Sequence, residues 1–286
     1  MTALTDRFRT LAPRYDVILS DVWGVTHNGI AATPEACDAL ARFRAGGGTV
    51  ILITNAPRRG VAVQKQIAHF GVPAEVYDGI VSSGDVTCGE IAKRPGQSIF
   101  HLGPQRDISI FEGLDVSFAP VERADYAVCT GLFHDDTETP DDYRGTIATM
   151  RARDLFMICG NPDVVVERGD HQLVYCAGAI ADVYLHAGGD VLYAGKPYRP
   201  IYDMAVEKAA AARGRPVAHD RVLAIGDSLR TDVKGAQAFG VDCLFVTAGI
   251  HAEELGGRDN PDPAMLAKTL AAAGVDPAAV MRRLAW

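Results

Sequence analysis

The stretch VILSDVWGVT, residues 17–26, decides the fold of this chain. Four mostly apolar residues lead directly into Asp21, and Gly24 follows after two further residues. A continuous apolar run is typical of a parallel strand that is buried on both faces. The pattern therefore predicts a strand that presents the carboxylate of Asp21 at its tip. By itself the pattern is weak, because a strand followed by Asp and Gly is usually only a turn.

Strands and helices alternate on both sides of this stretch. Helices are expected over 34–44, 60–70, 201–212 and 232–239, and strands over 49–53, 79–83, 221–225 and 242–247. Such alternation predicts a parallel sheet with right-handed crossovers, which is an α/β fold with a Rossmann-like core. The remaining C-terminal tail reads as two alanine-rich helices that cover the core.

The middle third of the chain has a different pattern of predicted helices and strands. A helix over 85–93 and strands over 98–102, 125–129 and 155–159 are separated by polar loops. This segment could form a small α/β unit of its own. The sequence therefore predicts a core domain made of residues 1–82 and 178–286, with a second domain, residues 83–177, inserted into it.

The composition and net charge limit the kinds of molecule that the chain can bind. The 286 residues are 48% hydrophobic and carry a net charge of −8, which repels nucleic acid and anionic membranes. An anionic ligand would need local positive groups or a metal. The six cysteines form no C-x-x-C pair and no signal-like or membrane-spanning apolar run is present, so a cytoplasmic protein with reduced cysteines is expected.

Polar residues follow several of the predicted strands. Asp21, Thr54-Asn55 and Asp227 each come directly after a strand, and Lys196 precedes the helix over 201–212. In an open parallel sheet, ligands bind where the carboxyl ends of the strands meet. Taken singly, Thr54 could be a helix N-cap and Lys196 a surface lysine, and Asp232 could cap its own helix. Together they predict one site at one edge of the sheet.

These residues resemble the four motifs of the haloacid dehalogenase (HAD) superfamily, in the right order. The matching segments are Asp21-x-Trp-Gly-Val, Thr54-Asn55, Gly195-Lys196-Pro197 and Gly226-Asp227-Ser228-x-x-x-Asp232. The insertion between the second and third motifs, with its Asn161-Pro162-Asp163, is similar to the C2-type cap domain of subclass IIA. That subclass contains p-nitrophenylphosphatase-like and sugar-phosphate phosphatases. The resemblance covers residues 15 to 250 and implies hydrolysis of a small phosphorylated metabolite.

The resemblance also implies a role for each residue. Asp21 would be the nucleophile that forms an aspartyl-phosphate, and Mg²⁺ would be held by Asp21, Asp227 and the backbone carbonyl of Trp23. Asp232 and Ser228 would lie around these ligands. Thr54, Asn55 and Lys196 would bind phosphoryl oxygens. Arg58 and Arg59 could reach an anionic group of the substrate, or could equally be solvated residues at a helix start.

Trp23 departs from the family pattern. In the phosphatases of this family, the residue two positions after the nucleophile is a second Asp, which protonates the leaving group and then deprotonates the attacking water. An indole cannot do either, and loss of such help costs about 10²–10⁴-fold in rate. His27 or His134 could supply the proton instead, although a lone histidine is more often structural.

Three functions follow from this departure. The chain could be a slow or narrow Mg²⁺-dependent phosphatase, which is the preferred interpretation. It could instead bind a phosphorylated ligand, or become phosphorylated, with little turnover. Lastly, it could resemble the metal-independent dehalogenases, which carry an aromatic residue at the same position. The sequence does not identify the substrate, and a homodimer formed through the cap is compatible with it.

Overall fold

The structure is a computed structural model that describes residues 5, 7–168 and 172–286. The chain forms two compact units. The first unit consists of Met1–Thr54, Val61–Val81 and Lys196–Trp286, and the second of Asn55–Gly60 and Ser82–Gly195. The chain therefore leaves the first unit and returns to it at Lys196.

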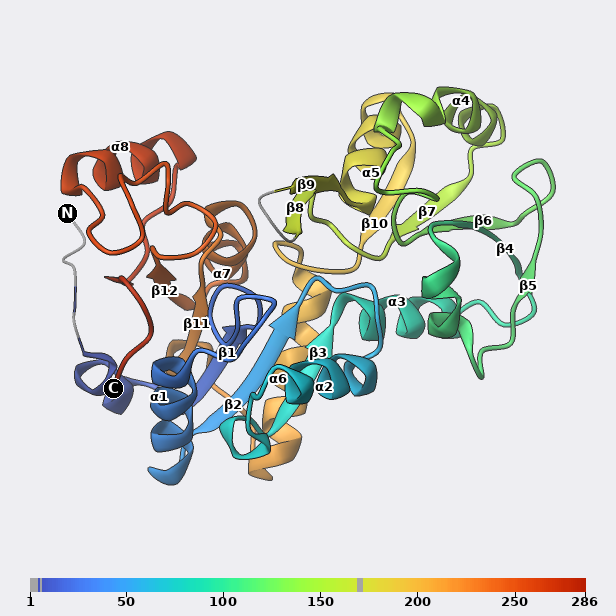
Figure 1. The fold of residues 1–286 in the computed structure, drawn as a ribbon. Coiled ribbons are helices and arrows are strands. Elements are labelled where there is room, and N and C mark those ends of the chain that lie inside the picture. Colours follow the sequence, from blue (N-terminus) through green and yellow to red (C-terminus); the bar gives the residue numbers. More distant parts are fainter. Residues whose placement is uncertain (1–4, 6, 169–171) are drawn as a thin grey trace. The chain divides into compact units, whose positions relative to one another are not determined.

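The first unit is built on a six-stranded sheet (Figure 1). Its strands, in spatial order, are β13 (Ala279–Met281), β12 (Asp242–Val246), β11 (Val222–Gly226), β1 (Val17–Asp21), β2 (Thr49–Thr54) and β3 (Gly79–Ser82). The pairs from β13 to β2 are all parallel. Every residue of β1, β2 and β11 is buried, which explains their nearly continuous apolar sequences.

Helices connect these strands. They are α1 (Pro34–Ala45), α2 (Gly60–His69), α6 (Arg199–Arg213), α7 (Lys234–Phe239) and α8 (Pro263–Ala273), with short 3-10 turns at Phe8–Thr10, Ala12–Arg14, Ala74–Val76 and His219–Arg221. Pro34 occupies the first turn of α1, and both α6 and α8 end at glycines in the left-handed conformation. Helices α1 and α6 both pack against β2.

The second unit has a parallel sheet of its own. Its order is β10 (Asp190–Tyr193), β7 (Phe156–Cys159), β6 (Tyr126–Cys129), β4 (Ser98–Leu102) and β5 (Ser117–Phe118), and β8 (Val165–Arg168) pairs with β9 (Gln172–Tyr175) in an antiparallel hairpin. The unit also contains α3 (Ser83–Ala92), α4 (Arg144–Ala152), α5 (Ala177–His186) and 3-10 turns at Gln105–Phe111 and Pro140–Tyr143. Residues of α4, α5, β6 and β7 share one apolar core.

The second unit extends further along the chain than the sequence suggests. The expected return to the core domain was residue 178, whereas α5 and β10 belong to the second unit up to Gly195. The reason is tertiary, because β10 pairs in parallel with β7 and thereby completes the second sheet. The short run Asp190–Tyr193 carries no local signal that would assign it to one sheet rather than the other.

One local prediction was wrong, and one helix begins differently from the expectation. The described C-terminal tail contains one helix, α8, rather than two, and Ala279–Met281 forms the edge strand β13 beside β12. The helix expected over 232–239 is present as α7, and a π-helical turn at Leu229–Val233 comes directly before it. In the tail, pairing with β12 overrides the helical preference of the alanine-rich sequence.

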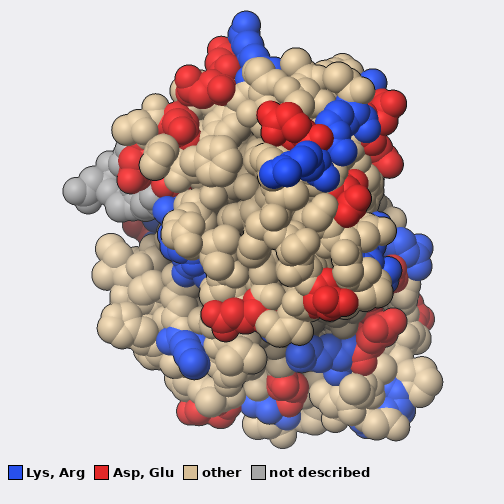
Figure 2. Space-filling view, turned by 90° about the vertical axis from the view of Figure 1, so that its right-hand side faces the viewer, with Lys and Arg blue, Asp and Glu red and all other residues tan. Residues whose placement is uncertain are grey.

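Charges on the surface are mixed in sign. Figure 2 shows a face on which Lys and Arg side chains lie interspersed with Asp and Glu side chains. The second unit has several such pairs, for example Arg144 with Asp141 at 2.9 Å and Arg151 with Asp154 at 3.0 Å. Among the residues described, no helix is both long and apolar enough to cross a membrane. All six cysteines are free thiols.

Candidate functional site

The site lies at the carboxyl ends of the strands in the first unit. Strand β1 ends at Asp21, β2 ends at Thr54, and β11 ends at Gly226 immediately before Asp227. The parallel register pairs Asp21 with Ile53, so these strand ends reach the same edge of the sheet. The structure thus brings strand ends that are far apart along the chain to one edge of the sheet.

Three buried carboxylates converge at this edge. Oxygen atoms of Asp21, Asp227 and Asp232 all lie within 4.8 Å of one another. Backbone N–H groups orient them: Val22 donates to Asp21 Oδ1 at 2.8 Å, Ile250 to Asp227 Oδ2 at 2.9 Å, and Ser228 to Asp232 Oδ2 at 3.0 Å. The three carboxylates are therefore held in place by the loops that follow β1, β11 and β12.

Lys196 lies among these acids and is only 2% exposed. Its Nζ lies 2.6 Å from Asp21 Oδ1 and 2.7 Å from Asp232 Oδ1. Burial alone would lower the pKa of Lys196, but the carboxylates of Asp21 and Asp232 outweigh burial and raise that pKa. The two carboxylates thus favour the charged form of the lysine.

One ammonium group does not balance three carboxylates. Burial, reinforced by the charge of Asp232, raises the pKa of Asp21 well above its usual range, and the same causes raise the pKa of Asp227 to about 7. A divalent cation would supply the missing positive charge. Carboxylate oxygens are the hard ligands that Mg²⁺ prefers, so the residues present fit such an ion.

Two glycines make room for Asp227. A Cβ atom on Gly24, whose φ is +80°, would lie 2.1 Å from Asp227 Oδ2, and one on Gly249 would lie 1.9 Å from the same atom. Sequence reasoning noted Gly24 only as the start of a turn and did not identify Gly249 or the N–H of Ile250. The one available signal was the position of Gly249 just after a predicted strand.

The other predicted residues divide between the units. Thr54 is buried at the end of β2 in the first unit, and Ser228 Oγ accepts a hydrogen bond from the N–H of Thr231 at 3.3 Å. In the second unit, Asn55 Nδ2 donates to Asp163 Oδ1 at 2.9 Å. This bond ties the second motif to the Asn161-Pro162-Asp163 segment.

The two arginines after Asn55 also belong to the second unit. The carbonyl of Arg58 accepts a hydrogen bond from Ser82 Oγ at 2.5 Å. Arg59 donates from Nη2 to the carbonyls of Ile110, at 2.9 Å, and Glu112, at 2.5 Å. Arg59 is therefore engaged in hydrogen bonds within its own unit.

Trp23 projects from the loop that follows Asp21, and its side chain is 47% exposed. Its ring meets the ring of His27 edge-on, with centroids 5.3 Å apart. His27 is buried, its Nδ1 accepts the N–H of Gly29 at 2.9 Å, and burial lowers its pKa to about 4. This histidine is thus a neutral packing residue at neutral pH, which argues against the proton-donating role considered for it.

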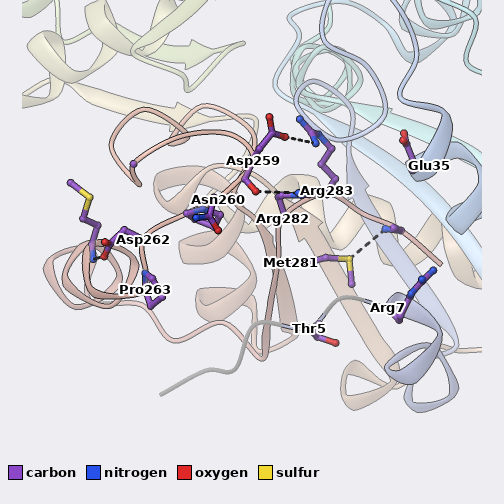
Figure 3. Close-up of a pocket in the computed structure, with 14 residues that line it drawn as sticks. Thr5, Arg7, Glu35, Asp259, Asn260, Asp262, Pro263, Met281, Arg282 and Arg283 are labelled. Atoms are coloured by element: carbon purple, nitrogen blue, oxygen red, sulfur yellow. Dashed lines mark hydrogen bonds and ion pairs between the residues drawn. The ribbon is translucent and has the colours of Figure 1, made fainter.

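A cavity lies elsewhere in the first unit, away from these carboxylates. It has a volume of about 860 Å³ and lies between the N-terminal segment, the loop before α8 and the C-terminal residues (Figure 3). Among its charged groups, Arg283 pairs with Asp259 at 2.9 Å and Asp262 caps α8. None of its described lining residues is Asp21, Thr54, Lys196, Asp227 or Asp232.

Comparisons with known proteins agree with this geometry. A haloacid dehalogenase-like hydrolase model matches residues 18–117, and a HAD-hydrolase-like model matches residues 193–273. A crystal structure of a haloacid dehalogenase-like hydrolase from Brucella suis 1330 is 44% identical, with a TM-score of 0.85, over 98% of this chain and 100% of that one. The 4-nitrophenylphosphatase of Thermotoga maritima shares the fold, with a TM-score of 0.72 and 23% identity over 96% of each chain.

A curated relative is more distant. The D-glycerol 3-phosphate phosphatase of Mycobacterium tuberculosis is 27% identical over 251 residues, which are 85% of this chain. The chain spans 66% of that relative's length, slightly less than two thirds.

Proposed function

Because the chain belongs to the haloacid dehalogenase-like hydrolase family, we propose that it is a phosphatase that hydrolyses a small phosphorylated metabolite. The observation that supports this most directly is the cluster of Asp21, Asp227, Asp232 and Lys196 at one edge of the sheet. The resemblance to this family found in the sequence is confirmed, and the fold is that of the nitrophenylphosphatase-like group, subclass IIA.

In this proposal Asp21 is the nucleophile. One of its oxygens attacks phosphorus while the bond from phosphorus to the leaving oxygen breaks, and water then hydrolyses the aspartyl-phosphate to phosphate and free Asp21. Lys196 lies close enough to Asp21 to hold a phosphoryl oxygen as well, and its charge offsets the repulsion between the carboxylate and the phosphate. Thr54 and Asn55, at the end of β2, are proposed as further phosphoryl ligands, and Arg58 as a ligand for the rest of the substrate.

Mg²⁺ is the proposed cofactor. Asp21, Asp227 and the backbone carbonyl of Trp23 would hold it, while Ser228 and Asp232 would orient the other groups. The excess of buried negative charge is the property of this chain that favours a divalent cation. When bound, the cation supplies positive charge that neutralises phosphoryl oxygens.

The second unit is proposed as a C2-type cap that selects the part of the substrate beyond the phosphate. Pairing of two such caps would give a homodimer, which gel filtration coupled to light scattering would test. The location in the cytoplasm, inferred from cysteines inside apolar runs, stays a prediction. His134, in the second unit, also remains a predicted proton donor.

Phosphate release from a panel of phosphorylated metabolites, measured with Mg²⁺ and with EDTA, tests the proposal. Native protein is expected to release phosphate only with the metal, and Asp21→Asn is expected to abolish release. Asp38→Asn is a matched control, because Asp38 is an exposed residue of α1 that pairs with Arg42 at 2.9 Å. Equal turnover by Asp21→Asn and native protein would contradict the proposal.

A second function is favoured by Trp23. An indole two residues from the nucleophile offers no acid or base, so the protein could bind a phosphorylated ligand, or become phosphorylated, without useful turnover. Intact-protein mass spectrometry separates these functions: a stable phosphorylated Asp21 without phosphate release indicates a binding or regulatory protein. A third function, metal-independent dehalogenation, fits less well with three buried carboxylates.

A further inference from the structure

We propose that the substrate is a phosphorylated acid or phenol, whose leaving group departs as an anion without receiving a proton. This inference rests on the proposed phosphatase function and specifies its substrate class. It follows from the way in which the loop after Asp21 is built. Three observations in the first unit support it.

The first observation is that the indole of Trp23 is fixed in place while it remains accessible. Gly29 has a φ of +87°, and a Cβ atom there would lie 2.6 Å from the indole, so the ring packs directly on the backbone. The indole also meets the ring of His27 edge-on, and that ring packs on Phe70 with centroids 4.9 Å apart. The loop therefore holds a half-exposed aromatic surface two residues from the nucleophile.

The second observation concerns the hydroxyl groups around Asp21. Thr26 Oγ1 donates to the carbonyl of Val22 at 2.8 Å, and Ser20 Oγ donates to the carbonyl of Asp21 at 2.9 Å. Both side chains are fully buried. Their protons are thus used to hold the backbone of the loop.

The third observation concerns the nitrogen donors of the same unit. Lys196 donates to two carboxylates. His27 Nδ1 accepts the N–H of Gly29, and the ring is buried. His251 bonds at both nitrogens, since Nε2 accepts the N–H of Leu229 at 3.2 Å and Nδ1 lies 2.9 Å from Glu254 Oε2. Each of these three side chains already makes a hydrogen bond or an ion pair within the protein.

The chemistry of the first step depends on where the electrons of the broken bond go. An oxygen of Asp21 forms a bond to phosphorus, the bond from phosphorus to the leaving oxygen breaks, and its electron pair stays on that oxygen. A carboxylate (pKa about 4) or a phenolate (pKa about 10) is stable enough to leave as an anion. A sugar alkoxide is about as basic as hydroxide, with a pKa of ~16, and needs a proton.

The second step is balanced in the same way. The oxygen of water attacks phosphorus, the bond from Asp21 to phosphorus breaks, and the carboxylate of Asp21 is regenerated. The protons of that water leave on the phosphate, which exchanges them with solvent. Neither step then requires an acid or base at position 23.

The indole also fits such a leaving group by shape. An aromatic face attracts flat apolar groups, and the indole N–H can only donate a hydrogen bond. A phenyl or acyl group could therefore pack on Trp23 while its phosphate is held near Lys196.

The test is the dependence of kcat/KM on the pKa of the leaving group. A series of ring-substituted phenyl phosphates, with acetyl phosphate and glycerol phosphate at the two ends, is assayed in Mg²⁺ for native protein, Trp23→Asp and Trp23→Phe. Native protein is expected to favour the most acidic leaving groups over glycerol phosphate by at least ~10²-fold, and Trp23→Asp to narrow this ratio by ~10²-fold. Trp23→Phe, which keeps an aromatic ring and adds no acid, should retain the steep dependence.

Two results would overturn the inference, and they differ. A flat dependence in native protein, with turnover that requires Asp21, refutes the inference alone and indicates a proton donor elsewhere, such as His134. No release from any member of the series, acetyl phosphate included, refutes the phosphatase function and this inference with it. Thermal melting of each variant identifies a folding defect, and Trp23→Phe keeps the test decisive if Trp23→Asp does not fold.

Discussion

Lys196 Nζ lies 2.6 Å from Asp21 Oδ1, although Asp21 ends the first strand and Lys196 follows the inserted second unit. The pair is buried, and Asp232 is the second partner of the lysine at 2.7 Å. This contact joins the first segment of the first unit to its last. The same contact places the positive group that a phosphoryl ligand would need beside the proposed nucleophile.

Lys196→Met is expected to lower the free energy of unfolding by about 3–5 kcal/mol, because it leaves the buried carboxylates without their cation. It should also abolish phosphate release. Urea unfolding in EDTA measures the first effect. Lys93→Met is the control: Lys93 is an exposed partner of Glu90, and loss of such a pair costs about 0–1 kcal/mol. Equal stability losses in the two variants would contradict the role assigned to Lys196.

Asp227→Asn is expected to remove most of the stabilisation that Mg²⁺ gives. A ligand at 100 times its dissociation constant stabilises a native protein by about 2.7 kcal/mol, and loss of one carboxylate from the cluster weakens the site. The amide oxygen of Asn can still accept the N–H of Ile250, so the loop should persist. Thermal melts across a Mg²⁺ titration measure the effect. An unchanged Mg²⁺ response would exclude Asp227 as a ligand.

The Asp227→Asn variant also tests how the stability of the native protein depends on pH. The pKa of Asp227 is raised to about 7 in the folded chain, so the folded state binds a proton more tightly than the unfolded state does. This contribution to stability in EDTA is present at low pH and is lost as pH rises to about 7. Native protein should therefore lose stability relative to Asp227→Asn as the pH rises from about 4 to about 7. A constant difference between the two melting curves would contradict the raised pKa.

For His101, in the second unit, the pH dependence of stability should have the opposite sign. Its Nε2 lies 2.9 Å from Thr130 Oγ1, and burial lowers its pKa to about 4. The folded state therefore binds a proton less readily than the unfolded state, and stability falls as pH drops from about 6.5 towards 4. His101→Gln, which keeps a polar partner for Thr130, should lose less stability between pH 7 and 5. Urea midpoints across this range provide the measurement.

Gly29→Ala is expected to destabilise the loop after Asp21 by about 1–3 kcal/mol. The residue has a φ of +87°, and the new methyl group would overlap the Trp23 ring at 2.6 Å. Gly47→Ala is a matched control, because its φ is +89° and its Cβ would meet nothing within 4 Å. Gly29→Ala should therefore cost more and also change tryptophan fluorescence. Equal costs would show that the contact with Trp23 contributes nothing.

The sequence by itself determined the strands and the residues at their tips. Apolar runs such as Val17–Asp21 and Thr49–Thr54 are nearly continuous because those strands are buried on both faces, so their positions could be predicted. Parallel pairing then brings the tips to one edge, and this made the grouping of Asp21, Thr54 and Asp227 predictable from the order of elements alone.

Only the tertiary structure decided the rest. Strand β10 joins the second sheet through its pairing with β7, and β13 joins the first through β12, because short segments take their conformation from the partners available. The approach of Gly249 to Asp227, the bond from Asn55 to Asp163 and the packing of Trp23 on Gly29 also join residues whose local sequence does not encode the contact. Distances of this kind depend on how complete elements pack, and the properties of single segments do not contain them.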